Sequence, residues 1–259
     1  MSISRNPTTG IGSHRVQPIS SLDDYDRASP AVDCVLITIV DGSLAVLIHR
    51  RSQNPFAGKW ALPGVFVHFG ESYERAAERA LRDKGGVARR CYKEQLEARN
   101  EPNRDPRGWV VTVAYLLLAR QELIIENIRS AGDAELAFIE SVSGHDLTDA
   151  ARIVVGSSRT AVELAFDHDE LVRSGIRRLQ AQIWYTALSL EFVPEAFTLR
   201  DLQAVFEAIL GVTLNRASFR RHVLEVVRLV EPTGETQTNV GHRPAALYKR
   251  GSEFGSAQS

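Results

Sequence analysis

The chain has 259 residues, of which 44% are hydrophobic, and its formal net charge at pH 7 is −1. This length and composition allow one large domain or two small domains with real cores, and the balanced total hides any local basic patch. Two cysteines predict no disulfide framework, and neither a signal-peptide core nor an apolar run long enough to span a membrane is visible, so we expect a cytoplasmic protein.

The first segments of the chain predict an arm followed by a β-hairpin. Residues 1–30 are rich in Ser, Thr, Gly, Pro and charged residues without periodicity, which indicates a flexible arm. Residues 31–40 and 44–49 are short apolar runs rich in Val and Ile, and Asp41-Gly42 separates them. Because an Asp-Gly pair favours a tight hairpin turn, these runs are predicted to pair as antiparallel strands.

Residues 64–87 form the most informative stretch: a glycine turn, about four turns of predicted helix, and a glycine stop. The stretch resembles the Nudix box, the loop-helix-loop with which Nudix enzymes hold a metal ion against a nucleotide diphosphate. Glu71 and Arg79 keep the frame of that motif. Three positions that are acidic in the family instead read Ala80, Asp83 and Lys84.

These three positions share one helix face, at the spacing of a metal site. Mg²⁺ binds through oxygen ligands, and the ammonium of Lys84 repels a cation, so we expect diphosphate hydrolysis to be very slow or absent and no cofactor to be required. Three alternatives stay open. Glu71 and Asp83 can hold a weak metal ion, Lys84 can meet a ligand phosphate or have no role, and the match can be an ordinary solvated helix face.

Cationic and aromatic residues precede this stretch. Arg50, Arg51 and Lys59 offer phosphate donors, and Trp60 offers a ring on which a base can stack, or else serves as a core anchor. Further on, residues 109–118 are apolar on both faces, as in a central strand. A helix is predicted over residues 169–192, and His168 is either a ligand contact or a structural residue at its start.

Residues 54–64, 104–108 and 164–168 together resemble the ADP-ribose branch of the Nudix family and, more closely, the NrtR family of Nudix-related regulators of NAD metabolism. The resemblance covers residues 22–250. It implies that residues 31–168 form a Nudix-type α/β/α sandwich with a mixed sheet, and that this domain senses ADP-ribose or an NAD-related nucleotide as effector. The implied ligand-binding residues are Arg50, Arg51, Lys59, Trp60, Glu71, Arg79, Lys84, Arg107 and His168.

Residues 193–250 predict a second domain after the connecting helix. Thr198, with Asp201 three residues on in a looser form of the capping box, starts a helix to residue 210. Asn215 is the predicted N-cap of a second helix over residues 216–227, with Phe219, Val223 and Val226 facing inward. Residues 229–233 and 245–249 can pair as a hairpin. This order predicts a winged helix-turn-helix domain.

The second helix of this domain is expected to enter the major groove of DNA. Eight basic against five acidic residues between 196 and 250 is a modest excess, so a protein-interaction module is the alternative. The candidate DNA-binding residues are Thr198, Asn215, Arg216, Ser218, Arg220, Arg221, His222, Arg243 and Lys249.

The combined expectation is a homodimeric repressor of NAD-biosynthesis genes that binds a palindromic operator, because a dimer adds affinity to the small contact of one winged helix. Residues 251–259 are expected to be a disordered tail. The main alternative is an active ADP-ribose pyrophosphatase with a metal site rebuilt from Glu71, Glu74 and Asp83.

Overall fold

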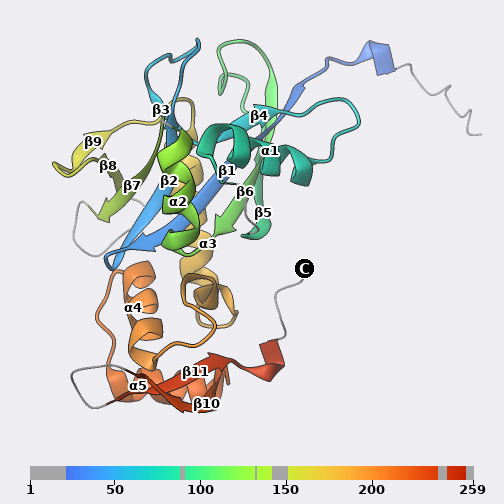
Figure 1. The fold of residues 1–259 in the computed structure, drawn as a ribbon. Coiled ribbons are helices and arrows are strands. Elements are labelled where there is room, and N and C mark those ends of the chain that lie inside the picture. Colours follow the sequence, from blue (N-terminus) through green and yellow to red (C-terminus); the bar gives the residue numbers. More distant parts are fainter. Residues whose placement is uncertain (1–21, 88–90, 132, 142–150, 239–243, 255–259) are drawn as a thin grey trace, which may run out of the picture.

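The structure is a computed structural model that describes residues 22–87, 91–131, 133–141, 151–238 and 244–254. Within these ranges, a nine-stranded mixed sheet with three helices forms the N-terminal domain, and two helices with a two-stranded sheet form the smaller C-terminal domain (Figure 1). No helix in the described ranges is both long enough and apolar enough to cross a membrane.

The large sheet has the strand order β5-β6-β1-β2-β7-β8-β9, with β3 paired to β2 and β4 paired to β1. A 3-10 helix, Leu22–Asp24, precedes it. The strands are β1 (Ser29–Val40), β2 (Ser43–Arg50), β3 (Trp60–Ala61), β4 (Gly64–Phe66), β5 (Tyr92–Arg99), β6 (Val110–Leu118), β7 (Ala134–Ser141), β8 (Ala151–Val155) and β9 (Thr160–Val162). The helices of this domain are α1 (Tyr73–Gly85), α2 (Gln121–Ala131) and α3 (His168–Gln182).

The predicted hairpin and central strand are confirmed. Strands β1 and β2 pair antiparallel, with Ile37 opposite Val46, and Asp41 and Gly42 turn the chain at φ values of 49° and 75°. Asp and Gly are among the residues that best tolerate this left-handed region. Strand β6 runs parallel to β1 and antiparallel to β5, so it has a neighbour on both sides.

Alternating side chains of the sheet build two apolar layers. Cys34 and Leu36 of β1 pack in the cluster that contains Ala77 of α1 and Ile124 of α2. Val35, which lies between them in sequence, packs in the cluster that contains the inner side chains of α3. Figure 1 shows α1 and α2 in front of the sheet and α3 behind it. The predicted α/β/α sandwich is therefore confirmed.

Helix α1 begins and ends where the sequence predicts. The hydroxyl of Ser72 accepts a hydrogen bond from the backbone N–H of Arg75, which caps the first turn. Gly86 ends the helix at φ 69° and donates its N–H to the carbonyl of Leu81.

The single connecting helix expected over residues 169–192 is wrong. Helix α3 ends at Gln182, and a separate 3-10 helix, Leu188–Phe192, follows. The hydroxyl and the backbone N–H of Thr186 both donate to the carbonyl of Gln182. The β-branched and aromatic residues over 183–186 have weaker helix propensity than the residues before them, which is consistent with a helix that ends at this point.

The C-terminal domain contains α4 (Leu199–Leu210), α5 (Arg216–Arg221), and the antiparallel strands β10 (Val230–Thr236) and β11 (Ala246–Arg250). The side chains of Thr198 and Asp201 form a reciprocal capping box at the start of α4. Asn215 caps α5 as predicted. The wing hairpin is also confirmed, although its tip, with Gly241, His242 and Arg243, lies outside the described residues.

Two details of this domain differ from expectation. A π-helical turn, His222–Val226, continues α5. Because a π-helical turn is wider than an α-helical turn, the side chains after it point in other directions than in a regular α-helix. Val226, which was expected to face inward, is therefore 66% exposed. The expected disordered tail begins instead with the buried Gly251 and a 3-10 helix, Ser252–Phe254. The N–H of Gly251 donates to the carbonyl of Leu229, which holds this stretch against the wing.

The two domains share one hydrophobic core. Ile176 and Leu179 of α3 belong to the same buried cluster as Leu202 and Phe206 of α4. Gln180 adds a hydrogen bond from its side-chain amide to the carbonyl of Ile209, at 2.9 Å. The sensor-like domain and the winged helix are therefore packed together through α3 and α4.

Candidate functional site

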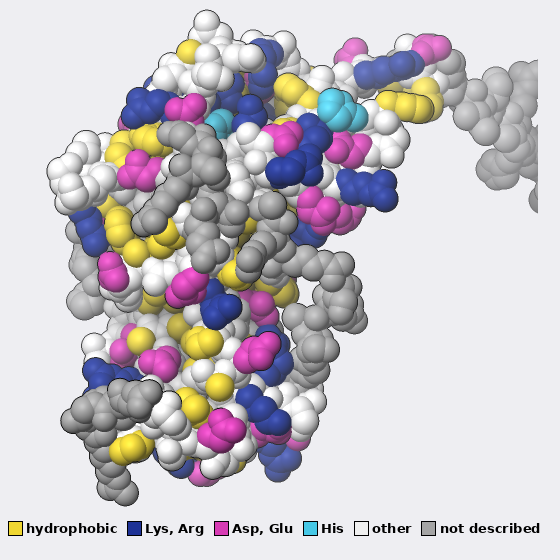
Figure 2. Space-filling model, in the orientation of Figure 1, with side chains coloured by type: hydrophobic (Ala, Val, Ile, Leu, Met, Phe, Trp, Pro, Cys, Tyr) yellow, Lys and Arg dark blue, Asp and Glu magenta, His cyan; other side chains and the backbone are white. Residues whose placement is uncertain are grey.

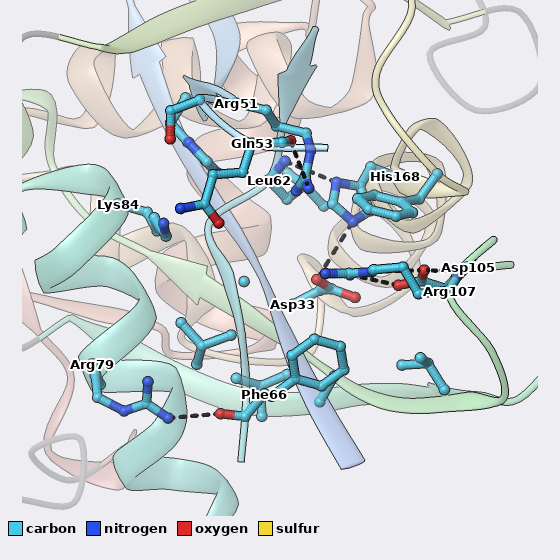
Figure 3. A pocket seen from close by; sticks show the side chains of 18 of the residues that line it. Asp33, Arg51, Gln53, Leu62, Phe66, Arg79, Lys84, Asp105, Arg107 and His168 are labelled. Carbon is cyan, nitrogen blue, oxygen red and sulfur yellow. Dashed lines mark hydrogen bonds and ion pairs between the residues drawn. The ribbon is translucent and has the colours of Figure 1, made fainter. Parts of the chain in front are cut away.

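A cavity of about 350 Å³ opens at one end of the large sheet (Figure 3). Its walls come from β1, β4, the loop after β2, α1, the loop before β6 and the start of α3. The lining residues are Ala31, Val32, Asp33, His49, Arg51, Ser52, Gln53, Leu62, Gly64, Val65, Phe66, His68, Arg79, Lys84, Asp105, Arg107, Val110, Phe166 and His168. Polar and charged groups from distant parts of the chain thus meet in one hollow.

His168 is fixed in the cavity wall by two contacts. The backbone N–H of Leu62 donates to Nδ1 of His168 at 2.9 Å, and Nε2 of His168 lies 3.4 Å from Oδ1 of Asp33. Because Nδ1 accepts a hydrogen bond, the ring proton of the neutral imidazole is on Nε2 and points to Asp33. His168 is the first residue of α3 and therefore has a structural role, and because it also lines the cavity, its role as a ligand contact stays a prediction.

Arg104 links Asp33 in the cavity lining to Asp167, the residue that precedes α3. Its guanidinium donates to Asp33 at 3.0 Å and to Asp167 at 2.7 Å, and its side chain is only 4% exposed. Burial alone would raise the pKa of Asp33, but the contacts with His168 and Arg104 lower that pKa well below its usual range. Sequence reasoning missed Asp33, Arg104 and Asp167, since they lie in three separate segments.

Two of the cavity's cations are paired with carboxylates of the same wall. Arg79 donates twice to Glu71, at 2.9 and 2.7 Å, and also to the carbonyl of Phe66. Arg107 binds Asp105 with an Nη2–Oδ2 distance of 2.6 Å. Arg79 and Arg107 are expected ligand contacts that do line the cavity, whereas Glu71 is occupied by Arg79 and lies outside the lining.

Guanidinium groups lie over aromatic rings on one side of the cavity. Arg107 lies 4.9 Å from the ring centroid of Phe66, and Arg51 lies 4.7 Å from that of Phe166. Such cation–π contacts hold the rings and the charged groups in fixed positions. Phe66 and Phe166 were not among the expected ligand contacts, although both lie in segments that carry the family resemblance, residues 64–87 and 164–168.

His49 is the second histidine of the cavity, and it lies at the end of β2. Its side chain is largely buried, and its Nδ1 lies 3.3 Å from the carbonyl of Arg50. Burial first, and then the positive charges of Lys84 and Arg51, lower the pKa of His49 from 6.5 to about 4. The imidazole is therefore neutral near pH 7.

Besides Glu71, three further expected ligand contacts lie outside the cavity lining. Arg50 stacks on the ring of Trp60 at 4.6 Å and donates to the carbonyl of Gly58. Trp60 packs against the main core, which fits the core-anchor alternative, and Lys59 lies near the ring of Phe56. The loop after β2 thus presents Arg51 and Gln53 to the cavity, rather than Arg50, Lys59 and Trp60.

The acidic residues of the Nudix-like helix do not fit a divalent metal ion. In the described part of the chain, no three His, Cys, Asp or Glu residues are grouped to hold one. Each acid of this region instead contacts a protein group, and Ala80 is buried in the core. The pairs are Glu71 with Arg79, Glu74 with the hydroxyl of Tyr115, Glu78 with Lys93, and Asp83 with Arg82.

The second candidate surface is the exposed side of α5. Arg216 and Arg221 are exposed there, next to Ser218, while Phe219 is buried against Phe206 of α4 with ring centroids 5.1 Å apart. On the face that Figure 2 shows, the winged-helix half of the molecule carries Lys and Arg side chains mixed with Asp and Glu. Any nucleic-acid contact therefore depends on a few positioned side chains.

Several expected DNA contacts already have protein partners. Arg220 donates to the hydroxyl of Tyr248 at 3.1 Å, and Lys249 pairs with Glu231 at 3.2 Å. Thr198 is buried in its capping box, so direct contact with DNA is excluded in this conformation. The remaining expected contacts are Asn215, whose side chain caps Ser218, His222, which packs on Trp184, and Arg243, which lies outside the described residues.

Comparison with known families divides the chain into the same two parts. Residues 28–160 match the model of the NUDIX domain, and residues 189–249 match the model of the NrtR DNA-binding winged helix domain. The chain is 33% identical over 228 residues to the "ADPR responsive transcriptional repressor NtrR" of Acinetobacter baylyi, a match that covers 87% of this chain and 83% of that protein.

Two further relatives represent the two possible activities. The crystal structure of Shewanella oneidensis NrtR complexed with a 27mer DNA is 35% identical, with a TM-score of 0.68, and the match covers 85% of this chain and 92% of that one. An ADP-ribose pyrophosphatase of Methanocaldococcus jannaschii is 30% identical over 139 residues, covering 54% of this chain and 70% of that protein.

Proposed function

The chain belongs to the NrtR family. From this membership we propose that it is a transcriptional repressor whose affinity for operator DNA changes when its Nudix domain binds ADP-ribose. The NtrR relative is named as an ADPR-responsive repressor, and the Shewanella relative is described in complex with DNA. We further propose that the regulated genes serve NAD biosynthesis and that the protein acts in the cytoplasm.

One structural observation supports this proposal above the others. Helix α3 begins with His168 in the cavity wall. Trp184, two residues after the end of α3, packs on His222, the first residue of the π-helical turn that continues α5. A ligand can change DNA affinity only if it binds differently to the DNA-competent and DNA-incompetent conformations. Helix α3 and Trp184 together connect the two sites and are suited to carry that difference.

The operator-binding form is proposed to be a homodimer on a palindromic site. One α5 helix of six residues offers only a short reading surface. Two copies contacting half-sites a whole number of helical turns apart would supply the missing affinity. Size-exclusion chromatography with light scattering, and titration of operator and half-operator duplexes, distinguish a dimer from a monomer.

The effector cavity is proposed to use Arg51, Arg79, Lys84, Arg107 and His168 from the expected set, together with Phe66 and Phe166. Cationic groups suit a diphosphate, and rings suit an adenine base. We propose that the domain binds without hydrolysing, because the acids of its helix contact protein groups rather than framing a metal site.

The decisive experiment measures binding of the full chain to promoter fragments of NAD-biosynthesis genes, with and without ADP-ribose, at several salt concentrations. The proposal predicts salt-sensitive operator binding with an affinity that ADP-ribose changes. Salt-insensitive or absent binding to every duplex would instead favour a protein-interaction module. Unchanged affinity at saturating ADP-ribose would remove ADP-ribose as the effector.

The alternative function is ADP-ribose hydrolysis, and the identity to the pyrophosphatase of Methanocaldococcus jannaschii favours it. A hydrolase needs a metal site formed by acids that are free to bind a cation. The acids of α1 and of the loop before it have protein partners, so the regulatory function is the better supported of the two.

A further inference from the structure

The cavity has four lining side chains with full positive charge, and only two of them are neutralised. Arg79 is paired with Glu71 and Arg107 is paired with Asp105. Within the described residues, Lys84 and Arg51 have no carboxylate partner. Arg51 donates only to backbone carbonyls, those of Pro55 and Gln53, which leave its charge intact.

Lys84 and Arg51 act on the same part of the cavity. Lys84 projects from the last turn of α1, while Arg51 and Gln53 project from the loop after β2 (Figure 3). The pKa of His49 falls to about 4, first because of burial and then through the charges of Lys84 and Arg51. The positive potential of both cations therefore overlaps around His49.

A divalent cation is disfavoured at this place for two reasons. The acids near this place are all engaged: Glu71 accepts hydrogen bonds from Arg79 and from the backbone N–H of His68, and the two acids that line the cavity, Asp33 and Asp105, are paired with Arg104 and Arg107. The ammonium of Lys84 occupies the position on α1 at which a metal ligand is expected, and it repels a second cation. The negative charge of a bound ligand must therefore be balanced by the protein itself.

We propose that Lys84 and Arg51 form the diphosphate subsite of the cavity and that effector binding needs no divalent cation. This inference rests on the proposed function, since it takes ADP-ribose as the effector. A diphosphate carries two negative charges, and two otherwise unmatched cations balance them. The paired Arg79 and Arg107 then shape the cavity, while Lys84 supplies the charge that a metal ion supplies in a Nudix hydrolase.

The size of the effect follows from hydrogen bonds between charged groups. Such a bond contributes enough that its loss weakens binding by about tenfold to a hundredfold. Lys84 lies at the exposed rim of the cavity, so the lower part of this range is expected for Lys84→Gln. Arg51→Gln is a second, independent variant, because Arg51 comes from the loop after β2 rather than from α1.

The experiment is calorimetric titration of the full chain with ADP-ribose, once in excess EDTA and once in excess Mg²⁺. The wild-type protein is expected to bind equally in both buffers, and Lys84→Gln and Arg51→Gln are expected to lose about tenfold in both. Arg82→Gln is the matched control, because Arg82 lies on the same helix, pairs with Asp83 and does not line the cavity. This control should bind like the wild type.

Competition by inorganic diphosphate assigns the loss to the proposed subsite. Diphosphate should displace ADP-ribose from the wild type and should compete at least tenfold less well against Lys84→Gln. The inference is overturned if the wild type binds ADP-ribose only with Mg²⁺, or if Lys84→Gln binds it as tightly as the wild type does. Either result leaves the effector proposal standing. No ADP-ribose binding in either buffer overturns the effector proposal, and this inference with it.

Discussion

The indole ring of Trp184 and the imidazole ring of His222 meet edge to face, with their centroids 4.9 Å apart. Nε2 of His222 also lies 3.4 Å from the carbonyl oxygen of Trp184. The same indole packs on Phe206 of α4, again with centroids 4.9 Å apart. Since α3 begins at His168 in the cavity wall, a helix of 15 residues and one tryptophan connect the cavity with both helices of the helix-turn-helix.

Replacing Trp184 with Leu is expected to weaken the coupling between effector and operator more than it weakens either binding reaction. Leucine keeps an apolar contact with α4 but loses the edge-to-face contact with His222. Coupling free energies are typically about 1–3 kcal/mol, so loss of this contact should reduce the effect of ADP-ribose on operator affinity several-fold. The measurement is the operator Kd with and without saturating ADP-ribose, and an unchanged ratio of the two Kd values would contradict the role of this contact.

Arg216 and Arg221 are the exposed arginines of α5 best placed to contact DNA. If each contacts a phosphate, Arg216→Ala and Arg221→Ala should each reduce the slope of log affinity against log salt by about 0.9 and weaken binding to all sequences alike. If one contacts a base edge, its loss should instead relax the preference at one operator position. Arg82→Ala removes a charge from α1 and should leave both the slope and the preference unchanged.

The sequence revealed the parts of this protein that depend on local signals. The Asp41-Gly42 turn, the Gly86 stop and the Thr198 capping box each result from neighbouring residues, and each occurs where it was predicted. The ion pairs of Arg104 beside the cavity were not predictable from local signals. Arg104 reaches across 71 residues to Asp33 and 63 residues to Asp167, and only the completed fold brings these side chains together.

Some expected ligand contacts lie outside the cavity, because residues that are neighbours in the sequence were expected to share one site. Arg50 and Trp60 are close in sequence to residues that line the cavity. Arg50 instead stacks on the ring of Trp60, and Trp60 packs against the core. Arg50 is the last residue of β2, whereas Arg51 is the first residue of the following loop, and only the loop residue lines the cavity. The sequence predicted the pairing of β2 with β1, but not its pairing with the short strand β3, which sets Arg50 opposite Trp60.

Replacing Arg104 with Met should destabilise the fold strongly. The variant leaves Asp33 and Asp167 without their shared guanidinium, in a place where Asp33 is 7% exposed. Removing one partner of a buried ion pair costs about 3–5 kcal/mol, and denaturant unfolding at pH 7 would measure this loss. Arg152→Met is the comparison, because Arg152 is 51% exposed and its partner Glu140 keeps Arg159, so this variant should cost much less. Equal losses in the two variants would contradict the structural role of Arg104.

Incubation with ADP-ribose and excess Mg²⁺ or Mn²⁺ is expected to release no AMP. The carboxylate of Glu71 is held by Arg79, and Lys84 repels a metal ion at the neighbouring position, so no Lewis acid is positioned on the diphosphate. The ADP-ribose pyrophosphatase of Methanocaldococcus jannaschii serves as the positive control. Metal-dependent release of AMP that disappears in Glu71→Gln would show that hydrolysis has been retained.

Effector binding should become tighter and take up protons as the pH falls from 7 to 5. In the free protein the pKa of His49 is about 4, below its usual 6.5, because burial and the charges of Lys84 and Arg51 disfavour the imidazolium. A diphosphate between those two cations adds negative charge near His49 and raises this pKa, so the bound state holds more protons than the free state at pH 5 and hardly more at pH 7. Titration in two buffers of different ionisation enthalpy measures the uptake, which His49→Gln should abolish. Equal heats in both buffers at pH 5 would place the diphosphate away from His49, and therefore away from Lys84 and Arg51.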